Sequence, residues 1–401
     1  MIHFSTAGES HGPALVSLLE GMPAGMPLVA LDVNTQLARR QQGYGRGRRM
    51  QIEQDEVEIL SGVRAGETLG SPIAMLIRNR DWTNWGEIMD PAPRDGDPGP
   101  RRRAVTRPRP GHADLTGMLK YDREDARDVL ERASARETTA RVAAGAVCKR
   151  LLAEFGVRIG SHVIHLGGID AGIPGELPDD LNAASDASPV RTLDREAESR
   201  MIAAIDAAKA AGNTLGGVCE VVVTGLPAGL GSHVSWDRKL DGRLAAAVMS
   251  IPAVKGVEIG LGFQAARRSG AEVHDEIHRA AERVASGGVR RLTNRAGGLE
   301  GGMTTGEPLV VRAAMKPIST LMRPLGTVDV VTGAAAAAVA ERSDVTAVPA
   351  MGVIAEAMVA LVLASAWSEK FGGDSMGEIR RNVEGYIVHI GARIGSARSG
   401  A

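Results

Sequence analysis

The sequence predicts a single α+β domain, and three observations lead to that prediction. Short runs rich in branched apolar residues, which are typical of strands, are mixed along the whole chain with segments whose apolar residues have helical spacing. No Ser-rich or Pro-rich linker longer than a loop divides the chain. Its 401 residues can supply one large core, or roughly two to three smaller ones of about 100–200 residues each. We therefore assign residues 1–390 to one domain and expect 391–401, which are small and polar, to form a flexible tail.

Five segments are predicted to be strands because they are short, rich in apolar and branched residues, and bounded by Gly, Pro or Asp. They are 13–23, 72–78, 157–169, 217–226 and 308–315. The first leaves room for only about two helical turns before Gly21 and Pro23, which favours a strand over a helix.

Four segments are predicted to be helices from the spacing of their apolar residues. They are 136–155, 197–211, 237–251 and 349–370. The first is the clearest, and Gly156 is placed to end it. The last contains the longest apolar stretch of the chain, but Glu356 interrupts that stretch and Pro349 and Gly372 flank it. We therefore predict a buried helix there rather than a membrane span.

Two segments, 36–50 and 90–111, interrupt this alternation of strands and helices. Both are rich in glycine and arginine, the second also in proline, and both show little periodicity. Long irregular segments inside a compact domain are usually functional loops or disorder. We expect the functional side chains to be found there.

The amino-acid composition limits the kinds of molecule that we expect the protein to bind. The net charge is −1, so any basic surface must be local, and aromatic residues make up only 3%, which argues against a stacking surface for single-stranded nucleic acid. Cys148 and Cys219 lack metal-site spacing, and so few cysteines indicate a reducing compartment without disulfides. The first residues do not resemble a signal peptide. We expect a cytoplasmic protein that binds no metal, nucleic acid or membrane.

The first arginine-rich segment, "ARRQQGYGRGRRM", contains no acidic residue, and three glycines allow its backbone to bend. Planar guanidinium groups match phosphate and carboxylate groups, so a polyanionic small molecule or a nucleic-acid backbone is the natural ligand. A solvated surface loop remains the alternative. The arginines are Arg39, Arg40, Arg46, Arg48 and Arg49.

A second arginine cluster leads directly into a Pro-Gly turn that carries His112. A histidine on a turn beside cations can donate a proton to an anionic substrate, although a lone histidine is more often structural. The sequence leaves both roles open. The arginines of this cluster are Arg101, Arg102, Arg103, Arg107 and Arg109.

Ser134 and Glu137 fit the capping box of a helix N-terminus. The structural interpretation of Ser134 is therefore a helix cap. It is compatible with a binding role, because the free N–H groups of a helix N-terminus attract phosphate.

The segment "GESHG" fits the G-x-S-x-G nucleophile elbow of serine hydrolases, with Ser10 as the nucleophile. The elbow requires a helix after the serine, whereas 13–23 is predicted to be a strand. A triad histidine is also brought from elsewhere in the fold, while His11 is the next residue. The pattern at 373–377 follows a helix instead of a strand, so it fails the same test.

No segment combines a nucleotide-binding motif with the secondary structure that the motif requires. The segment 260–265 fits G-x-G-x-x-A, but the residues after it do not begin an apolar-periodic helix, so a dinucleotide fold is not expected. A P-loop sequence does not occur.

Nine segments of the sequence, taken together, are specific for one protein family. They are "GESHG", "RRQQGYGRGRRM", "RPGHAD", "ERASARET", "AVKGVEIGLGF", "NRAGGLEGGMTTGEP", "AMKPIST", "ERSDVTAVPA" and "FGGDS", in order from near the N-terminus to about residue 376. With these segments the chain resembles the chorismate synthases.

The resemblance implies an α+β fold with helices sandwiched between antiparallel β-sheets, assembled as a homotetramer. It implies a lyase that performs the 1,4-anti-elimination of phosphate from 5-enolpyruvylshikimate 3-phosphate to give chorismate, the last step of the shikimate pathway to aromatic amino acids. Such enzymes require reduced FMN without net redox change. NADPH would serve only as an external source of reducing equivalents, with a separate flavin reductase as a partner.

The resemblance also implies roles for individual residues. His11 would protonate the leaving phosphate with Ser10 as a hydrogen-bonding neighbour, His112 would stabilise negative charge on the flavin, and Asp374 would assist proton handling at the flavin N5. The substrate-binding residues would be Ser10, Arg40, Arg46, Arg49 and Arg136. Flavin contacts would come from Arg132, Ala133, Ser134, Pro252, Ala253, Gly301, Lys316, Pro317, Ile318, Ser319, Thr320 and Arg342.

Two positions depart from the pattern of the family. Pro252 stands where relatives often carry Asn, so only a backbone contact to the flavin is carried over, and Ala133 stands where serine is frequent. The alternatives are a phosphate- or RNA-binding protein without catalysis, and an unrelated phosphatase or lyase that acts on a sugar phosphate without flavin. The first would lose affinity steeply with salt.

Overall fold

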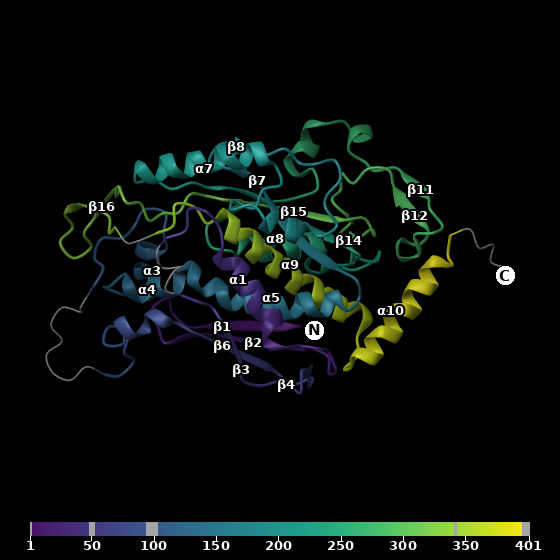
Figure 1. Ribbon diagram of the computed structural model, residues 1–401, viewed down its shortest axis with the longest axis horizontal. Coiled ribbons are helices and arrows are strands. Elements are labelled where there is room, and N and C mark those ends of the chain that lie inside the picture. The colour runs from purple at the N-terminus through teal and green to yellow at the C-terminus, as the bar shows by residue number, and fades with distance from the viewer. Residues whose placement is uncertain (1, 48–52, 94–102, 341–342, 395–401) are drawn as a thin grey trace.

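The computed structural model describes residues 2–47, 53–93, 103–340 and 343–394. In this part of the chain, two antiparallel sheets enclose a layer of helices (Figure 1). The α+β sandwich predicted from the sequence is therefore confirmed. Residues 395–401 of the expected tail lie outside the described residues, and the preceding helix extends to Gly391.

The smaller sheet contains four strands in the order β1-β2-β6-β3. Their bounds are β1 (His3–Ala7), β2 (Ala14–Glu20), β6 (Ile73–Arg78) and β3 (Val57–Ile59). Leu15 and Leu19 of β2 and Ile73, Met75 and Ile77 of β6 are buried, which follows the alternation of a sheet with one face in the core. This sheet carries the turn with Ser10 and His11 between β1 and β2.

The larger sheet contains five strands in the order β10-β15-β9-β7-β8. Their bounds are β10 (Val254–Ile259), β15 (Leu309–Met315), β9 (Gly217–Thr224), β7 (Arg158–Leu166) and β8 (Ile169–Asp170). Four short hairpins lie outside the two sheets: β4 (Val63–Arg64) with β5 (Glu67–Thr68), β11 (Ile277–Arg279) with β12 (Val289–Arg291), β13 (Leu299–Glu300) with β14 (Met303–Thr304), and β16 (Gly326–Val328) with β17 (Ala335–Ala337).

The α-helices among the described residues differ in their surroundings. Two of them, α5 (Thr138–Ala153) and α9 (Val348–Phe371), form the centre of the molecule. The others are α1 (Ala30–Gln41), α3 (Asp114–Tyr121), α4 (Arg127–Ala133), α6 (Leu181–Asp186), α7 (Arg195–Ala210), α8 (Leu240–Met249) and α10 (Met376–Gly391).

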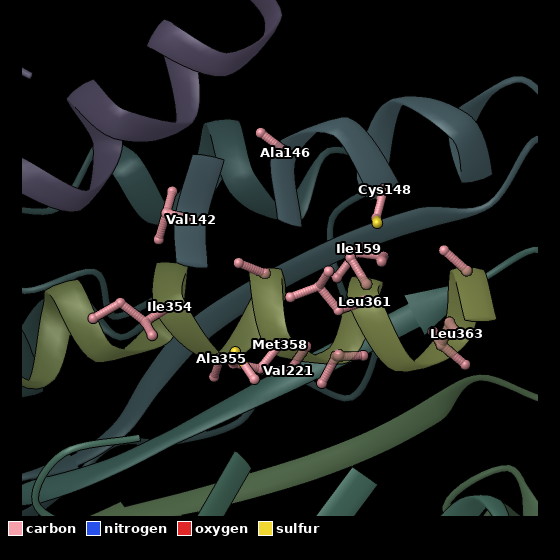
Figure 2. Close-up of a cluster of buried hydrophobic side chains, with 14 of the residues drawn as sticks. Val142, Ala146, Cys148, Ile159, Val221, Ile354, Ala355, Met358, Leu361 and Leu363 are labelled. Atoms are coloured by element: carbon pink, nitrogen blue, oxygen red, sulfur yellow. The ribbon is translucent and has the colours of Figure 1, made fainter. Parts of the chain in front are cut away.

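The core forms where α5 and α9 pack on each other. Helix α5 also contacts the four-stranded sheet and α9 the five-stranded sheet, so the two helices join the sheets. Figure 2 shows side chains of both helices gathered with Ile159 of β7 and Val221 of β9. The two backbones approach closely at Gly145, where an added Cβ would lie 2.4 Å from the Cβ of Ala357. A larger residue there would push the helices apart.

Helix α9 is apolar on all sides, as expected of a helix covered from every direction. In the part of the chain that the structure describes, it is the one helix long and apolar enough to cross a membrane, and nearly all of it is buried inside the protein. The prediction of a buried helix is confirmed.

Glu356, the acidic residue within α9, is fully buried and surrounded by partners. Its carboxylate accepts hydrogen bonds from Arg39 (2.9 Å), Lys149 (2.6 Å) and the hydroxyl of Ser161 (2.6 Å). Burial alone would raise the pKa of Glu356, but Lys149 and Arg39 outweigh it and hold this pKa well below its usual value. The charge is thus kept in the core by its partners.

Most of the predicted elements are present, with small differences in their bounds. The segment 13–23 contains β2 and no helix, which removes the support that a hydrolase elbow needs. The predicted strand 157–169 is divided into β7 and β8, because Gly167 and Gly168 both have positive φ and form a tight turn.

One expectation was wrong. The segment 36–50 is not irregular at its start, because α1 continues to Gln41. Val33 and Leu37 of α1 are buried at helical spacing, and Arg39 and Arg40 occupy its last turn, where cations interact favourably with the helix dipole. Because the segment is rich in arginine, its sequence did not indicate that it begins inside a helix.

Candidate active site

His11 lies in the turn between β1 and β2 and is held by one carboxylate of α4. Its Nδ1 atom lies 2.8 Å from Oε2 and 3.0 Å from Oε1 of Glu131, and its backbone N–H donates to Oε2 at 2.9 Å. The backbone N–H of Ser10 donates to the carbonyl oxygen of Glu131 at 2.9 Å. Four contacts therefore fix both residues of the turn to α4.

Glu131 is itself buried and paired. Arg127, one helical turn earlier, donates to Oε1 at 2.8 Å. Burial raises the pKa of Glu131, but the hydrogen bonds from His11 and Arg127 outweigh it, and the net effect is a lowered pKa. The carboxylate is thus ionised at neutral pH and faces the imidazole as an anion.

An aromatic side chain covers the ring of His11. The indole of Trp85 stacks on the imidazole, and the guanidinium groups of Arg103 and Arg127 lie 4.5 Å and 5.0 Å from the centroid of the same indole. A cavity of about 610 Å³ lies beside Trp85. Its lining residues are Thr83, Asn84, Gly86, Glu87, Ile88 and Arg103.

Arg132 fixes the first strand to α4. Its guanidinium donates to the carbonyl oxygens of Thr6 and Gly8, both at 3.0 Å, and to the hydroxyl of Thr6 at 2.8 Å. Ala133 ends α4, and Ser134 then caps the short 3-10 helix Ala135–Glu137 by accepting from the N–H of Arg136 at 3.3 Å. The cap that the sequence predicts is present, although α5 begins only at Thr138.

Two of the expected substrate arginines, Arg40 and Arg136, are buried and paired with an acid, so they do not belong to a solvated surface loop. Arg40 is 3% exposed and Arg136 is 4% exposed, and both contact the carboxylate of Asp55. Burial lowers the pKa of Arg40 to about 9, although the charge of Asp55 opposes this effect. Arg46 pairs with Asp344 at 3.3 Å.

Arg39 belongs to a different cluster from its neighbour Arg40. It pairs with Glu356 and with Asp186 in the core. The neighbouring arginines Arg39 and Arg40 therefore enter different ion-pair clusters, and no feature of their sequence distinguishes them. Arg49 and Arg342 lie outside the described residues.

His112 follows the Pro110–Gly111 turn and repeats the arrangement seen at His11. Its Nδ1 lies 2.5 Å from Oδ1 of Asp114, and Arg109 donates to Oδ2 of the same carboxylate at 2.8 Å. Burial raises the pKa of Asp114, but the hydrogen bonds from His112 and Arg109 outweigh it and hold this pKa well below its usual range. A buried anion again faces an imidazole.

The segment 316–320 packs against the turn of His112. The ammonium of Lys316 donates to the carbonyl oxygen of Gly111, and Arg109 donates to the hydroxyl of Thr320 at 2.9 Å. The N–H of Lys316 donates to the carbonyl oxygen of Ala253 at 2.9 Å, so the Pro252 position joins the same region. Pro317, Ile318 and Ser319 lie between these contacts.

The two histidines lie at the same end of a helical hairpin. Helix α3 begins just after His112, and α4 ends just after Glu131. The helices are joined by a short loop and pack closely at Gly117, where an added Cβ would lie 2.3 Å from Val129 (Figure 1). In such a hairpin the start of the first helix and the end of the second meet.

Asp374 and Gly301 are not brought to the histidines within one chain. The carbonyl oxygen of Asp374 accepts from the N–H of Ala24, beyond the end of β2 opposite to His11. The seven residues of β2 span about 20 Å. Gly301 lies in the β13–β14 turn, which contacts the start of α8, whereas Pro252 follows its end.

Sequence reasoning missed three residues of the site, namely Glu131, Trp85 and Asp114. Asp114 stands two residues after His112, a spacing that could have drawn attention to it. Nothing in the local sequence connects Glu131 to His11, because 120 positions separate them. Among the described residues, no group of three or more His, Cys, Asp or Glu side chains is placed to hold a metal ion.

A larger cavity, of about 830 Å³, lies away from both histidines, between α5, α6 and one end of the inner strands β7, β9 and β15. Lys149, Arg158 and Asn182 are among its lining residues, and none of the predicted site residues is. We therefore base the site on the histidine, carboxylate and arginine contacts instead of on cavity size.

Comparison with known proteins gives a consistent result. The model of the family described as "Chorismate synthase" matches residues 2–367. Curated relatives named chorismate synthase include those of Geobacter sulfurreducens, 58% identical over 98% of this chain and 100% of the relative, and Syntrophotalea carbinolica, 59% identical over 97% and 98%. A solved structure titled "Crystal Structure of Chorismate Synthase" is similar with a TM-score of 0.77 and 44% identity, covering 98% of each chain.

The fold and the site define an α+β protein in which two histidines, each anchored by a buried carboxylate, stand among buried arginines. These matches extend over most of the chain, and all of them are to chorismate synthases. The chain belongs to the chorismate synthase family.

Proposed function

We propose that this protein converts 5-enolpyruvylshikimate 3-phosphate to chorismate by 1,4-anti-elimination of phosphate. In that reaction the C–O bond to the phosphate breaks, a proton leaves C6, and a new double bond forms. The observation that carries the proposal is the anchored imidazole of His11 next to buried arginines, in a chain of this family. A leaving phosphate needs both positive charge and a proton donor.

The arginines have the properties required to bind the substrate. Arg40 and Arg136 are fixed by hydrogen bonds to Thr138, Asn79 and Asp55. Because these guanidinium groups are already held in place, little free energy is needed to reorganise them when an anion binds. We assign Arg40, Arg46 and Arg136 to the phosphate and carboxylate groups of the substrate, with Ser10 as a further polar neighbour.

His11 would donate its proton to an oxygen of the leaving phosphate. The carboxylate of Glu131 is hydrogen-bonded to Nδ1 of His11. Within the described part of the chain, Nε2 has no hydrogen-bond partner. Nε2 is therefore the ring atom available to a substrate. The stack on Trp85 fixes the plane of the ring, so this atom points in one direction.

Reduced FMN is proposed as the cofactor, and the residues near His112 fit it. Lys316 and Thr320 supply a cation and a hydroxyl near the imidazole, and Ser134 caps a turn that follows α4. When bound, reduced FMN would supply electron density to the substrate and recover it, so the reaction has no net redox change. His112 would hold a positive charge or a proton beside the flavin.

A homotetramer is part of the proposal. Asp374 and Gly301 lie away from the histidines of their own chain, so a role in the site would bring them from a neighbouring copy. The protein would act in the cytoplasm, with NADPH only as the source of electrons for a separate flavin reductase.

The test is an anaerobic assay with the purified protein, the substrate and chemically reduced FMN. We expect chorismate absorbance and inorganic phosphate to appear in a ratio of one to one. Phosphate release without chorismate would indicate a phosphatase, and an absence of both products would refute the proposed function. Substitution of His11 by Ala supplies the matched control.

A non-catalytic phosphate- or RNA-binding role is less well supported. The arginines that would track a nucleic-acid backbone are buried and paired with Asp55 and Asp344. Binding to RNA would fall steeply with ionic strength, whereas binding of a small anion in a pocket would respond less. A salt titration of substrate affinity distinguishes the two.

A further inference from the structure

Three histidines of the described chain share one arrangement, in which a carboxylate lies between the imidazole and an arginine. They are His11 with Glu131 and Arg127, His112 with Asp114 and Arg109, and His162 with Glu220 and Arg312. The first two stand at the end of the α3–α4 hairpin. The third lies in the five-stranded sheet, where the His162 side chain is only 1% exposed.

The arrangements differ in what they leave accessible. At His11 and His112 the carboxylate contacts Nδ1, and no described residue bonds to Nε2. Both rings are partly exposed, with 15% and 18% of the side chain accessible. At His162 the carboxylate contacts Nε2 and the ring is enclosed. Only the first two can present a nitrogen to a ligand.

Glu131 makes more contacts with its histidine than Asp114 makes with His112. It bonds to Nδ1 of the His11 ring and accepts from the backbone N–H of His11, so it fixes the side chain and the turn together. The ring can then neither rotate about its χ angles nor exchange its two nitrogens without breaking a hydrogen bond to a buried anion.

We propose that Glu131 is the positioning residue of the reaction: its hydrogen bond holds a proton on Nδ1 and fixes the ring, so that Nε2 of His11 is the nitrogen that faces the leaving phosphate and delivers the proton. This inference rests on the proposed function. Glu131 does not touch the substrate and acts through His11. Arg127 keeps Glu131 in place and, together with Trp85, encloses the pair.

Charges of both signs surround the imidazole, and Glu131 is the one in hydrogen-bond contact with the ring. The others come from the turn of His11, from α4 and from the segment that covers Trp85. The charged groups around His11 are Glu9, Arg103, Arg127, Glu131 and Arg132.

The test compares Glu131→Gln with the wild type in the anaerobic assay. A neutral amide can donate to Nδ1, which moves the proton of the neutral ring to Nε2. We expect kcat to fall about tenfold or more with KM changed less than threefold. Glu131→Asp, which keeps the carboxylate, should restore part of the turnover.

The matched control is Glu220→Gln, which removes a buried carboxylate from the enclosed third arrangement. Per folded molecule, this variant should keep the wild-type kcat even if its melting temperature falls. If Glu131→Gln keeps the wild-type kcat, or if the two variants lose activity only in proportion to unfolded protein, the proposal is wrong.

A readout without activity separates this proposal from the proposed function. In protein labelled with ¹⁵N-histidine, with the signal assigned by its loss in His11→Gln, the neutral ring should carry its proton on Nδ1 in the wild type and on Nε2 in Glu131→Gln. A proton on Nε2 in the wild type would overturn the role of Glu131. A wild type that forms no chorismate but shows the expected tautomer would instead overturn the function alone.

Discussion

The imidazole of His11 lies against the indole of Trp85, with ring centroids 3.9 Å apart and planes inclined by 20°. Glu131 fixes the edge of the imidazole, and Trp85 fixes its face. Two independent contacts thus determine where the free ring nitrogen points.

Replacing Trp85 by Ala should reduce kcat by roughly 2- to 10-fold, because an aromatic stack contributes about 0.5–1.5 kcal/mol beyond its area. Trp85→Phe should retain more activity, since it keeps a face for the imidazole. Steady-state kinetics at saturating substrate measures both effects. Trp236→Ala is the control, because Trp236 is 85% exposed and no ring contact with a histidine is found for it among the described residues. Equal losses in Trp85→Ala and Trp236→Ala would contradict a role for the stack.

Replacing His11 by Ala should lower kcat by about a hundredfold or more, the usual scale for a lost general acid. Ser10→Ala should keep substantial activity, because the backbone N–H of Ser10, which that substitution retains, makes the contact to Glu131. The two variants are compared under single-turnover conditions. A trapped covalent adduct on Ser10, together with inactivity of Ser10→Ala, would restore the hydrolase interpretation.

Arg40→Ala and Arg46→Ala should both weaken substrate binding, since each removes a charge-assisted contact that contributes about 1.5–3 kcal/mol. Their stabilities should differ. Arg40 is buried with Asp55, whose carboxylate would lose one of its partners, whereas Arg46 pairs with the more exposed Asp344. Substrate titration and thermal unfolding of each variant check this difference. Unchanged substrate affinity in both variants would remove these arginines from the site.

Acid should destabilise the protein through Glu356. Its pKa in the folded protein lies below the ordinary value of 4.5, so the charge stabilises the fold above that pH, and the stabilisation is lost as the pH falls below it. Glu356→Gln should lower the stability at pH 7 by about 3–5 kcal/mol, because Lys149, Arg39 and Arg191 lose their counterion. Its stability should also depend less on pH below 4.5. Denaturant unfolding at several pH values measures this, with the exposed Glu58→Gln as a control.

The protein should be active with chemically reduced FMN in the absence of oxygen and nearly inactive in air with oxidised FMN and NADPH. The reason is that the G-x-G-x-x-A segment at Gly260 leads into the 3-10 helix Gly262–Arg267 instead of an α-helix that could bind a pyrophosphate. The number of chorismate molecules formed per FMN measures this. Sustained turnover from NADPH with the purified protein would demonstrate a built-in reductase activity.

The sequence predicted the elements whose pattern is local. Buried strands such as β9 and the central helices α5 and α9 carry their signal in consecutive residues. The helices α1, α3, α4, α6 and α10 were not predicted. Helices α3, α4 and α6 are short, whereas Met376, Ile379 and Val383 of α10 do have helical spacing, so that pattern was present in the sequence and was missed. Propensity is weak in such segments, and tertiary packing decides.

The site was predicted only in part, for a similar reason. The histidines and arginines stand in recognisable segments, but their partners come from elsewhere. Glu131 reaches His11 across 120 positions, and Asp55 joins Arg40 to Arg136. These pairings depend on how β2, α1 and α4 are placed by the core, which no local pattern encodes. The roles carried over from the family for all of the site residues, Asp374 and Gly301 included, stay predictions.

The position of α9 has a consequence for how the protein is made. This helix occupies residues 348–371, near the end of the chain, yet α5 and the five-stranded sheet, formed from earlier residues, both pack on it. While the chain is being synthesised, the apolar inner face of that sheet lacks the cover of α9 until residues 348–371 emerge. The centre can therefore be completed only after this helix is made, and chains that terminate before residue 348 expose a surface prone to aggregate.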